Sequence, residues 1–260
     1  MVLVVDIGNT NIVLGAYVDD VLTFTARIAT NKDKTADEYS VILNGIFSLN
    51  NISTEKIEGV IISSVVPPLT GVFETSLKHF TTVPFMIVGP GIKTGFIIKI
   101  DNPAQLGTDM VCNVAGALAE FKKGSLIVID MGTATTITVV DENGNILGGS
   151  ISPGLRLSLN ALSGGTAQLP FINLDQIKKV IGTNTIDCMQ SGVICGCASM
   201  IDGMVDRISR ELNANPKIII TGGMSSKVIP HCMHDLYHRP NLLVEGLYNL
   251  YLKNKPSTEQ

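Results

Sequence analysis

The sequence lacks the features that mark several large classes of protein. Only 16% of its 260 residues are charged, the formal net charge is -4, and lysine and arginine form no cluster. Nucleic-acid-binding proteins usually carry a basic patch, so no such partner is expected. The longest apolar runs have the length of a strand, whereas a bilayer-spanning helix needs roughly 20 residues, and no basic leader precedes the first strand. We therefore expect a cytoplasmic protein without a nucleic acid or membrane partner.

Cysteine is also sparse, and its pattern argues against a disulfide framework. The five cysteines are an odd number, lie in apolar or helical settings and form no CxxC pair. This pattern favours reduced core thiols over disulfides or a zinc site. The residues are Cys112, Cys188, Cys195, Cys197 and Cys232.

A group of histidines lies near the C-terminal end of the chain. His231, His234 and His238 are spaced to share one helical face, with Cys232 nearby, and could in principle hold zinc. The spacing lacks a companion acid or a distant ligand pair, so a solvated histidine cluster is favoured.

Apolar β-branched runs alternate with longer helical patterns along the whole chain. The length and the 45% hydrophobic content allow one or two domains with a sizeable core. The alternation predicts an α/β fold with a substantially parallel sheet. Strands are expected at Val2–Val5, Ile12–Tyr17, Val21–Ile28, Gly59–Ser63, Phe85–Val88, Leu126–Ile129, Thr136–Val140, Ile146–Ser150, Lys217–Thr221 and Leu242–Val244. Helices are expected at Thr35–Leu49, Pro68–Phe80, Leu106–Phe121, Gly154–Leu162, Ser191–Leu212 and Gly246–Lys253, the first with a capping box of Thr35 and Glu38.

One segment of the sequence occurs twice in similar form. LVVDIGNTNIVLGAYVDDVL, which starts at Leu3, resembles IVIDMGTATTITVVDENGNIL, which starts at Ile127. In each copy an apolar strand ends at an aspartate, Asp6 or Asp130, and a glycine, two small residues and a second strand follow. The repeat predicts two similar lobes, residues 1–120 and 121–255, that face each other and bring both turns to one cleft.

Each of the repeated turns has the composition of a phosphate-binding site. Glycine allows close approach of the backbone to a ligand, and backbone amides with Asn and Thr side chains can donate to phosphate oxygens. A carboxylate at the strand end, such as Asp6, can hold a hydrated Mg²⁺. An ordinary hairpin turn explains one copy about equally well, but the two copies together favour a nucleotide. The chain has neither a P-loop pattern ending in GKS or GKT nor a GxGxxG after a strand.

An ordered series of short motifs is similar to that of the type III pantothenate kinases, which belong to the actin-like and sugar kinase superfamily. The two phosphate motifs are DIGNT at Asp6–Thr10 and DMGTA at Asp130–Ala134. Each of the other motifs is weak alone, but their order is specific: TADEY at Thr35, SSVVP at Ser63, KTG at Lys93, DNP at Asp101, GTD at Gly107, ISPG at Ile151, TAQLP at Thr166, GTNT at Gly182, QSG at Gln190 and TGG at Thr221. The resemblance implies two duplicated RNase H-like lobes with a cleft between them.

The resemblance also implies an activity and a set of site residues. The reaction would be ATP-dependent phosphorylation of pantothenate to 4′-phosphopantothenate, the first step of coenzyme A biosynthesis, in a homodimer. Asp109 resembles the general base, a role that suits a carboxylate because phosphoryl transfer needs a place for one proton; without the family context, a helix N-terminal acid is the favoured interpretation. Asp130 resembles the carboxylate that binds K⁺ or NH₄⁺. The expected ATP contacts are Asp6, Ile7, Gly8, Asn9, Thr10, Asn11, Ile12, Val13, Gly132, Thr133, Gly222 and Gly223, and the expected substrate contacts are Gly107, Thr108, Asp109, Met110 and Thr185, the last across the dimer interface or as a helix cap.

Two positions depart from the family pattern. Met110 stands where the family usually has arginine, and Ile100 stands where it often has tyrosine. Arginine offers a forked, charged donor for a carboxylate or phosphate, and methionine offers none. Both changes fall on the acceptor side, so a paralogue with a different acceptor and a non-catalytic regulatory homologue are the alternatives. The chain shows no basic helix-turn-helix pattern, which argues against direct DNA binding.

Overall fold

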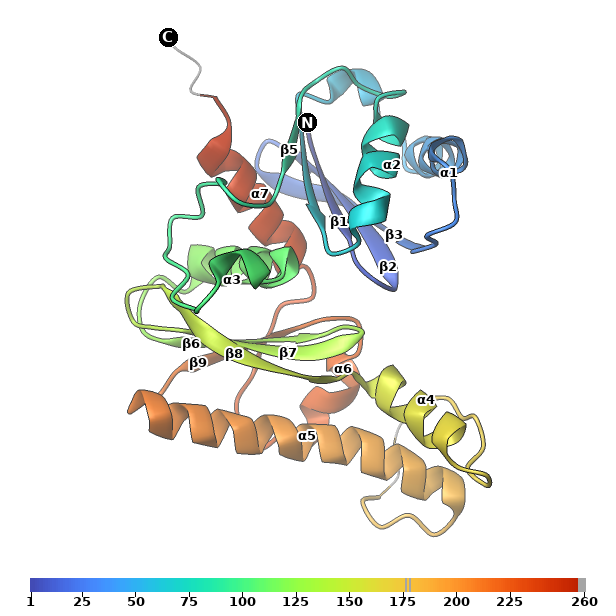
Figure 1. The fold of residues 1–260 in the computed structure, drawn as a ribbon, viewed down its shortest axis with the longest axis vertical. Coiled ribbons are helices and arrows are strands. Elements are labelled where there is room, and N and C mark those ends of the chain that lie inside the picture. The colour runs from blue at the N-terminus through green and yellow to red at the C-terminus, as the bar shows by residue number, and fades with distance from the viewer. Residues whose placement is uncertain (176, 178, 257–260) are drawn as a thin grey trace. The chain divides into compact units, whose positions relative to one another are not determined.

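The chain folds into two compact units, each built around one five-stranded sheet (Figure 1). The computed structural model describes residues 1–175, 177 and 179–256. The first unit contains the described residues of Met1–Gly95, Asn102–Glu120 and 242–256, and the second contains those of Phe96–Asp101 and Phe121–Asn241. The sequence predicted a boundary between lobes at residue 120, and the chain passes from the first unit to the second after Glu120. The expected second lobe ran to residue 255, whereas the segment after Asn241 packs with the first unit.

The first sheet has the strand order β3-β2-β1-β4-β5. Strands β1, β2 and β3 are antiparallel, whereas β4 and β5 run parallel to β1. Every residue of β1 is buried, as expected for a central strand with helices on both faces. The bounds are β1 (Val2–Ile7), β2 (Asn11–Val18), β3 (Val21–Ala29), β4 (Gly59–Ser64) and β5 (Phe85–Ile87).

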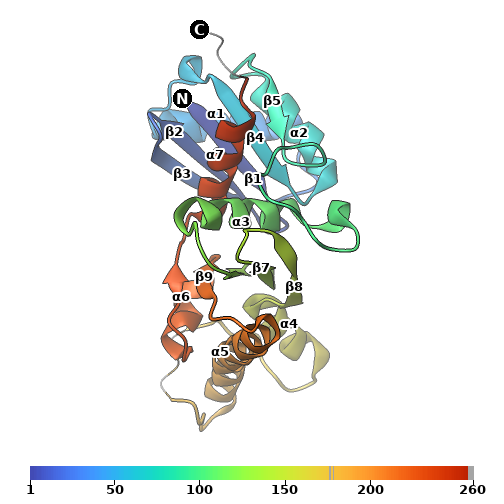
Figure 2. The ribbon, with the colours of Figure 1, turned by 90° about the vertical axis from the view of Figure 1, so that its left-hand side faces the viewer.

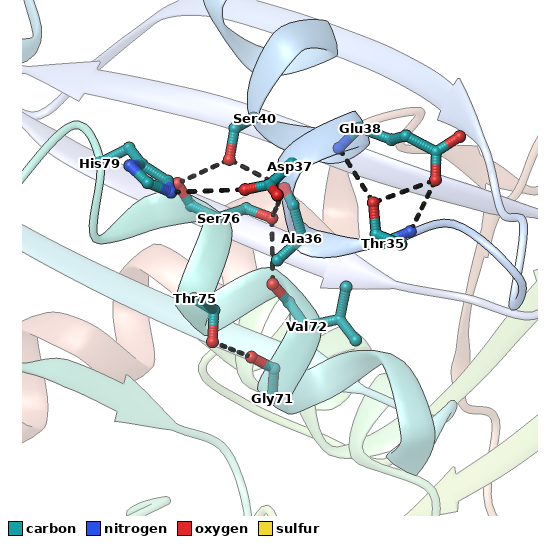
Figure 3. Close-up of polar contacts among 10 residues, drawn as sticks. All are labelled: Thr35, Ala36, Asp37, Glu38, Ser40, Gly71, Val72, Thr75, Ser76 and His79. Carbon is teal, nitrogen blue, oxygen red and sulfur yellow. Dashed lines mark hydrogen bonds and ion pairs between the residues drawn. The ribbon is translucent and has the colours of Figure 1, made fainter.

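Helices α1 (Ala36–Leu49) and α2 (Pro67–Leu77) cover one face of this sheet and share its core. The predicted capping box is confirmed, because Thr35 N donates to Glu38 Oε2 at 2.8 Å and Glu38 N donates to Thr35 Oγ1 at 3.3 Å (Figure 3). The buried Ser76 ties α2 to α1 by donating to the Ala36 carbonyl at 2.7 Å (Figure 3).

Helices α3 (Thr108–Glu120) and α7 (Leu242–Asn254) pack against each other in the first unit (Figure 2). Their backbones come very close where Gly246 of α7 meets α3, since a Cβ atom on Gly246 would overlap the Cys112 carbonyl oxygen. The predicted strand Leu242–Val244 is wrong, because these residues form the first turn of α7. A short apolar run cannot be told from a buried helix segment by periodicity alone, and Gly246 concealed the continuation.

The second sheet has the order β10-β9-β6-β7-β8, with β6, β7 and β8 antiparallel and β9 and β10 parallel to β6. It therefore repeats the strand order and directions of the first sheet, which agrees with the repeat in the sequence. The bounds are β6 (Leu126–Met131), β7 (Ala134–Val140), β8 (Ile146–Pro153), β9 (Lys217–Thr221) and β10 (Tyr237–His238). Strand β10 was not predicted, because two residues give no periodic signal.

Helices α4 (Leu155–Gly165), α5 (Thr185–Leu212) and α6 (Ser225–Val228) complete the core of the second unit. Among the described residues, short 3₁₀ turns lie at Thr54–Lys56, Pro103–Gln105 and Ile229–His231. Helix α5 starts six residues before the predicted Ser191, because the Asn184 side chain caps it by accepting from Asp187 N at 2.9 Å.

Helix α5 is long and apolar enough to cross a membrane by length and composition alone, which the short apolar runs of the sequence did not suggest. Half of its most apolar window is buried inside the protein. Its buried side chains, including Ile194, Ile201 and Val205, pack against the second sheet. These contacts are those of a core helix of a globular unit.

Candidate active site

The first phosphate turn follows β1 in the first unit. Gly8 N donates to the Asn11 carbonyl at 3.0 Å, and Asn9 and Thr10 are exposed at the tip. Thr30, just after β3, holds both ends of the tip: its Oγ1 donates to the Gly8 carbonyl at 2.6 Å and its N donates to the Thr10 carbonyl at 3.0 Å. The turn is therefore fixed by backbone and side-chain hydrogen bonds while its tip stays accessible.

The other residues of the predicted ATP motif lie in the strands beside this turn. Ile7 and Ile12 are completely buried and belong to the hydrophobic core. A ligand at the turn could reach them only through their backbone. Asp6 is 7% exposed and lies at the carboxyl end of β1.

The second phosphate turn follows β6 in the second unit and is one residue shorter than the first. Gly132 N donates to the Ala134 carbonyl at 3.0 Å, two residues on, whereas Gly8 reaches three residues on. Gly154 N donates to the Thr133 carbonyl at 3.1 Å, so the ISPG motif holds this turn. Thr133 is exposed.

The TGG motif lies against the second turn. The parallel pairing of β6 with β9 places Asp130 opposite Thr221, and Gly222 follows. Gly222 has φ of +95°, and a Cβ atom there would lie 2.6 Å from Asp130 Oδ1. Only glycine satisfies both the backbone conformation and the close approach to this carboxylate.

Asp109 lies in the first turn of α3 and is partly buried. Burial raises the pKa of its carboxyl group. Met110 N donates to Oδ1 at 2.8 Å, and this hydrogen bond favours the ionised form and so opposes the effect of burial. A Cβ atom on Gly107 would overlap Asp109 Oδ1, so the carboxylate folds back over that glycine. A carboxylate whose pKa is raised by burial is a stronger base than an ordinary aspartate.

Three of the predicted substrate contacts have contrasting environments. The Thr108 hydroxyl faces the sheet, 3.0 Å from Ser63 Oγ and 3.2 Å from the Ser64 carbonyl oxygen. Met110 is only 8% exposed, in the buried face of α3. Thr185 is the exposed first residue of α5, and the residue that caps this helix is Asn184.

The predicted histidine cluster does not share a helical face. His231 ends a 3₁₀ turn, His234 lies in a loop 3.1 Å from Asp206 Oδ1, and His238 belongs to β10 with its Nε2 2.9 Å from Ser225 Oγ. Within the part of the chain that the structure describes, no three His, Cys, Asp or Glu side chains gather as a metal cage.

The five cysteines are free, and only part of the expectation of core thiols holds. Cys112 is fully buried in α3, whereas Cys188 is exposed on α5.

Sequence reasoning gave no role to Thr30 or Ser63, although the SSVVP motif contains the second of these. Both act through hydrogen bonds between segments that are 22 and 45 residues apart in sequence. The only available signal was a polar residue at the end of an apolar run, which is common in loops.

Two solved structures, one of an ATPase-like activator and one of a sugar kinase homologue, share the fold of this chain. A Clostridium difficile activator of 2-hydroxyisocaproyl-CoA dehydratase, solved with bound ADPNP, matches with a TM-score of 0.56 at 11% identity, over 98% of this chain and 96% of that one. A Sinorhizobium meliloti protein proposed to be a 2-dehydro-3-deoxygalactonokinase matches with a TM-score of 0.56 at 12% identity, over 98% and 100% of the two chains. At such identities the likeness describes the fold alone.

Sequence similarity gives the particular family. The type III pantothenate kinase family model matches residues 2–207. A type III pantothenate kinase of Geotalea daltonii is 42% identical over 260 residues, which cover 99% of this chain and 100% of the relative. The chain belongs to the type III pantothenate kinase family.

Proposed function

We propose that the protein transfers the γ-phosphoryl group of ATP to the hydroxyl of pantothenate, giving 4′-phosphopantothenate in the first step of coenzyme A biosynthesis. The observation that carries the proposal is the environment of Asp109: a carboxylate with a raised pKa at the start of α3, in the unit that also holds the turn after β1. Membership of the family supplies the substrates, since its members carry the name pantothenate kinase.

The proposed roles follow from what each group can donate or accept. Asp109 accepts the proton of the pantothenate hydroxyl as its oxygen attacks the γ-phosphorus, and ADP leaves with the electron pair of the broken P–O bond. Backbone amides and exposed side chains at the turns of Gly8–Thr10 and Gly132–Thr133 donate to ATP phosphate oxygens.

The residues present fit the two cations that the family resemblance implies. Mg²⁺ is commonly held by one or two carboxylates together with waters and substrate phosphates, so it needs no all-protein cage. Asp6, at the carboxyl end of β1, would hold it through water. Asp130, against Gly222, would hold K⁺ or NH₄⁺. When bound, the cations would neutralise charge on the polyphosphate.

We also propose a homodimer in the cytoplasm, with Thr185 contacting substrate across the interface. The support is a set of large apolar side chains that remain exposed near α4 and the start of α5, since exposed apolar surface can mark a protein–protein interface. They include Phe171 at 78%, Ile181 at 80% and Ile151 at 73% exposure. Sedimentation at the concentration of the activity assay tests this, and an active monomer would contradict it.

The test of the activity is ATP consumption by the pure protein with and without pantothenate, in K⁺ and in Na⁺ buffer. We expect consumption that depends on both pantothenate and K⁺. A paralogue with another acceptor would bind ATP but show no dependence on pantothenate, and a non-catalytic homologue would consume no ATP with any acceptor. Because Met110 is buried, the identity of pantothenate as the acceptor is the part of the proposal that this assay tests most severely.

A further inference from the structure

Ser63 is a completely buried hydroxyl at the carboxyl end of β4. The parallel pairing of β1 with β4 places it opposite Asp6, the last polar residue before the first phosphate turn. Its Oγ lies 3.0 Å from Thr108 Oγ1, in the first turn of α3, and its side chain also hydrogen-bonds the Cys112 thiol. Ser63 therefore joins the strand pair beside the first phosphate turn to the helix that carries Asp109.

The direction of the hydrogen bonds follows from the number of protons. Each hydroxyl has one proton to donate. Thr108 Oγ1 donates its proton to the Ser64 carbonyl at 3.2 Å, so Ser63 must be the donor toward Thr108. Cys112 is fully buried and its pKa is raised well above the ordinary value, chiefly by burial, although the hydrogen bond with Ser63 lowers it. The hydrogen bonds therefore run from the Ser63 hydroxyl through the Thr108 hydroxyl to the Ser64 carbonyl.

The two residues of α3 that hydrogen-bond Ser63 lie on one face of the helix. Thr108 and Cys112 are four residues apart, which is about one helical turn. Ser63 therefore contacts α3 on two successive turns, at Thr108 and at Cys112. This fixes both the position and the rotation of the turn that contains Asp109.

We propose that Ser63 and Thr108 are positioning residues that hold Asp109 at the distance from the first phosphate turn that proton transfer needs. In this arrangement the Thr108 hydroxyl is committed to the sheet and does not contact the substrate. The proposal rests on the role of Asp109 as the general base. A general base must lie within hydrogen-bond reach of its proton, and a misplacement of about 1 Å can cost roughly 10²-fold in rate.

The test compares Ser63→Ala with Ser76→Ala as a matched control. Ser76 is also completely buried in the first unit and its hydroxyl also hydrogen-bonds, at 2.7 Å to Ala36 O and 3.0 Å to Val72 O, but it joins α2 to α1 (Figure 3). Both variants lose a buried hydroxyl, so thermal unfolding should show similar losses of stability. We expect kcat to fall by roughly 10- to 10²-fold in Ser63→Ala alone, with KM for ATP changed by less than about twofold.

A second pair of variants keeps the test decisive if Ser63→Ala does not fold. Thr108→Ser retains the hydroxyl and should retain kcat, whereas Thr108→Val keeps the shape, loses the hydroxyl and should lower kcat as Ser63→Ala does. In Thr108→Val the acid limb of the kcat–pH profile should also move to lower pH, because a loosened Asp109 gains water and loses part of the burial that raises its pKa.

The outcomes separate this inference from the proposed function. If Asp109→Asn is inactive while Ser63→Ala and Thr108→Val behave like Ser76→Ala, the positioning role is refuted and the base survives. If Thr108→Val raises KM for pantothenate and leaves kcat unchanged, Thr108 is a substrate contact and the inference is wrong. If Asp109→Asn keeps normal turnover, the proposed base itself is refuted.

Discussion

Replacing Gly246 with alanine should destabilise the protein, although alanine is the better helix former. A Cβ atom at this position would overlap the Cys112 carbonyl oxygen and lie 2.6 Å from the Cys112 carbonyl carbon and 2.9 Å from Gly116 N. All of these are backbone atoms of α3, which cannot rotate away as a side chain can. Because ordinary contact begins near 3.4 Å, α7 would have to withdraw from α3 by about 1 Å or more.

The size of the effect follows from two opposing contributions. Overpacking a close interface costs about 1–3 kcal/mol, while replacing glycine within a helix returns roughly 0.5–1 kcal/mol. The net loss of up to about 2.5 kcal/mol corresponds to a fall in Tm of up to roughly 10 °C for a chain of this size. Turnover should fall as well, because α3 carries Asp109.

Gly45→Ala is the matched control for this measurement. Gly45 lies within α1 of the same unit, and a Cβ atom there would meet nothing within 4 Å. Its replacement should raise the Tm by roughly 1–4 °C, so the two glycine-to-alanine changes should have opposite signs. Differential scanning calorimetry of both variants measures this. A Gly246→Ala variant as stable as Gly45→Ala would refute the close crossing of α3 and α7.

Three further predictions concern single side chains. Asp109→Asn should lower turnover by about 10²- to 10⁴-fold in steady-state assays. Its Tm at pH 7 should be unchanged or higher, because burial disfavours the ionised carboxylate in the folded state. A large loss of Tm would contradict this reasoning. Burial would raise the pKa of Asp141, but hydrogen bonds from Lys99, Asn145 and Asn143 outweigh it and lower the pKa to about 2. This stabilisation is present above the unfolded pKa of about 3.9 and is lost as the pH falls through about 2. The Tm of Asp141→Asn should therefore lie below that of the wild type at neutral pH, and the difference should close over that interval. A difference that does not depend on pH would count against this prediction. Thr30→Val removes the hydrogen bond to the first phosphate turn and should weaken ATP binding by about 2- to 12-fold in calorimetric titrations, whereas unchanged affinity would mean that the turn holds its shape unaided.

The sequence predicted the sheets better than the helix boundaries. Strands β1, β4, β6 and β9 were predicted because each is a short β-branched run, and the equivalence of Asp6 and Asp130 followed from the repeat. The second sheet repeats the order of the first, as the duplication required. What failed was local: Leu242–Val244 has the composition of a strand but is held in a helix by packing on α3.

The motifs of the site could be predicted from the sequence, but the hydrogen bonds that hold these motifs in place could not. Asp109, Gly8 and Gly132 stand in short motifs that can be read along the chain. The contacts of Thr30 with Gly8 and of Ser63 with Thr108 join distant segments, so only the fold reveals them. Met110 was expected to face the substrate, but its 8% exposure gives no sign of that. Periodicity along α3 cannot say which buried side chains also border a ligand. Its contact with substrate remains a prediction.

The most direct test of the account is to incubate the pure protein with ATP, Mg²⁺, K⁺ and pantothenate and to identify the product by mass spectrometry. We predict stoichiometric formation of 4′-phosphopantothenate and ADP by the wild type, and formation slower by at least about 10²-fold by Asp109→Asn. ATP turnover with no phosphorylated pantothenate, or equal product from the wild type and Asp109→Asn, would contradict the central claim.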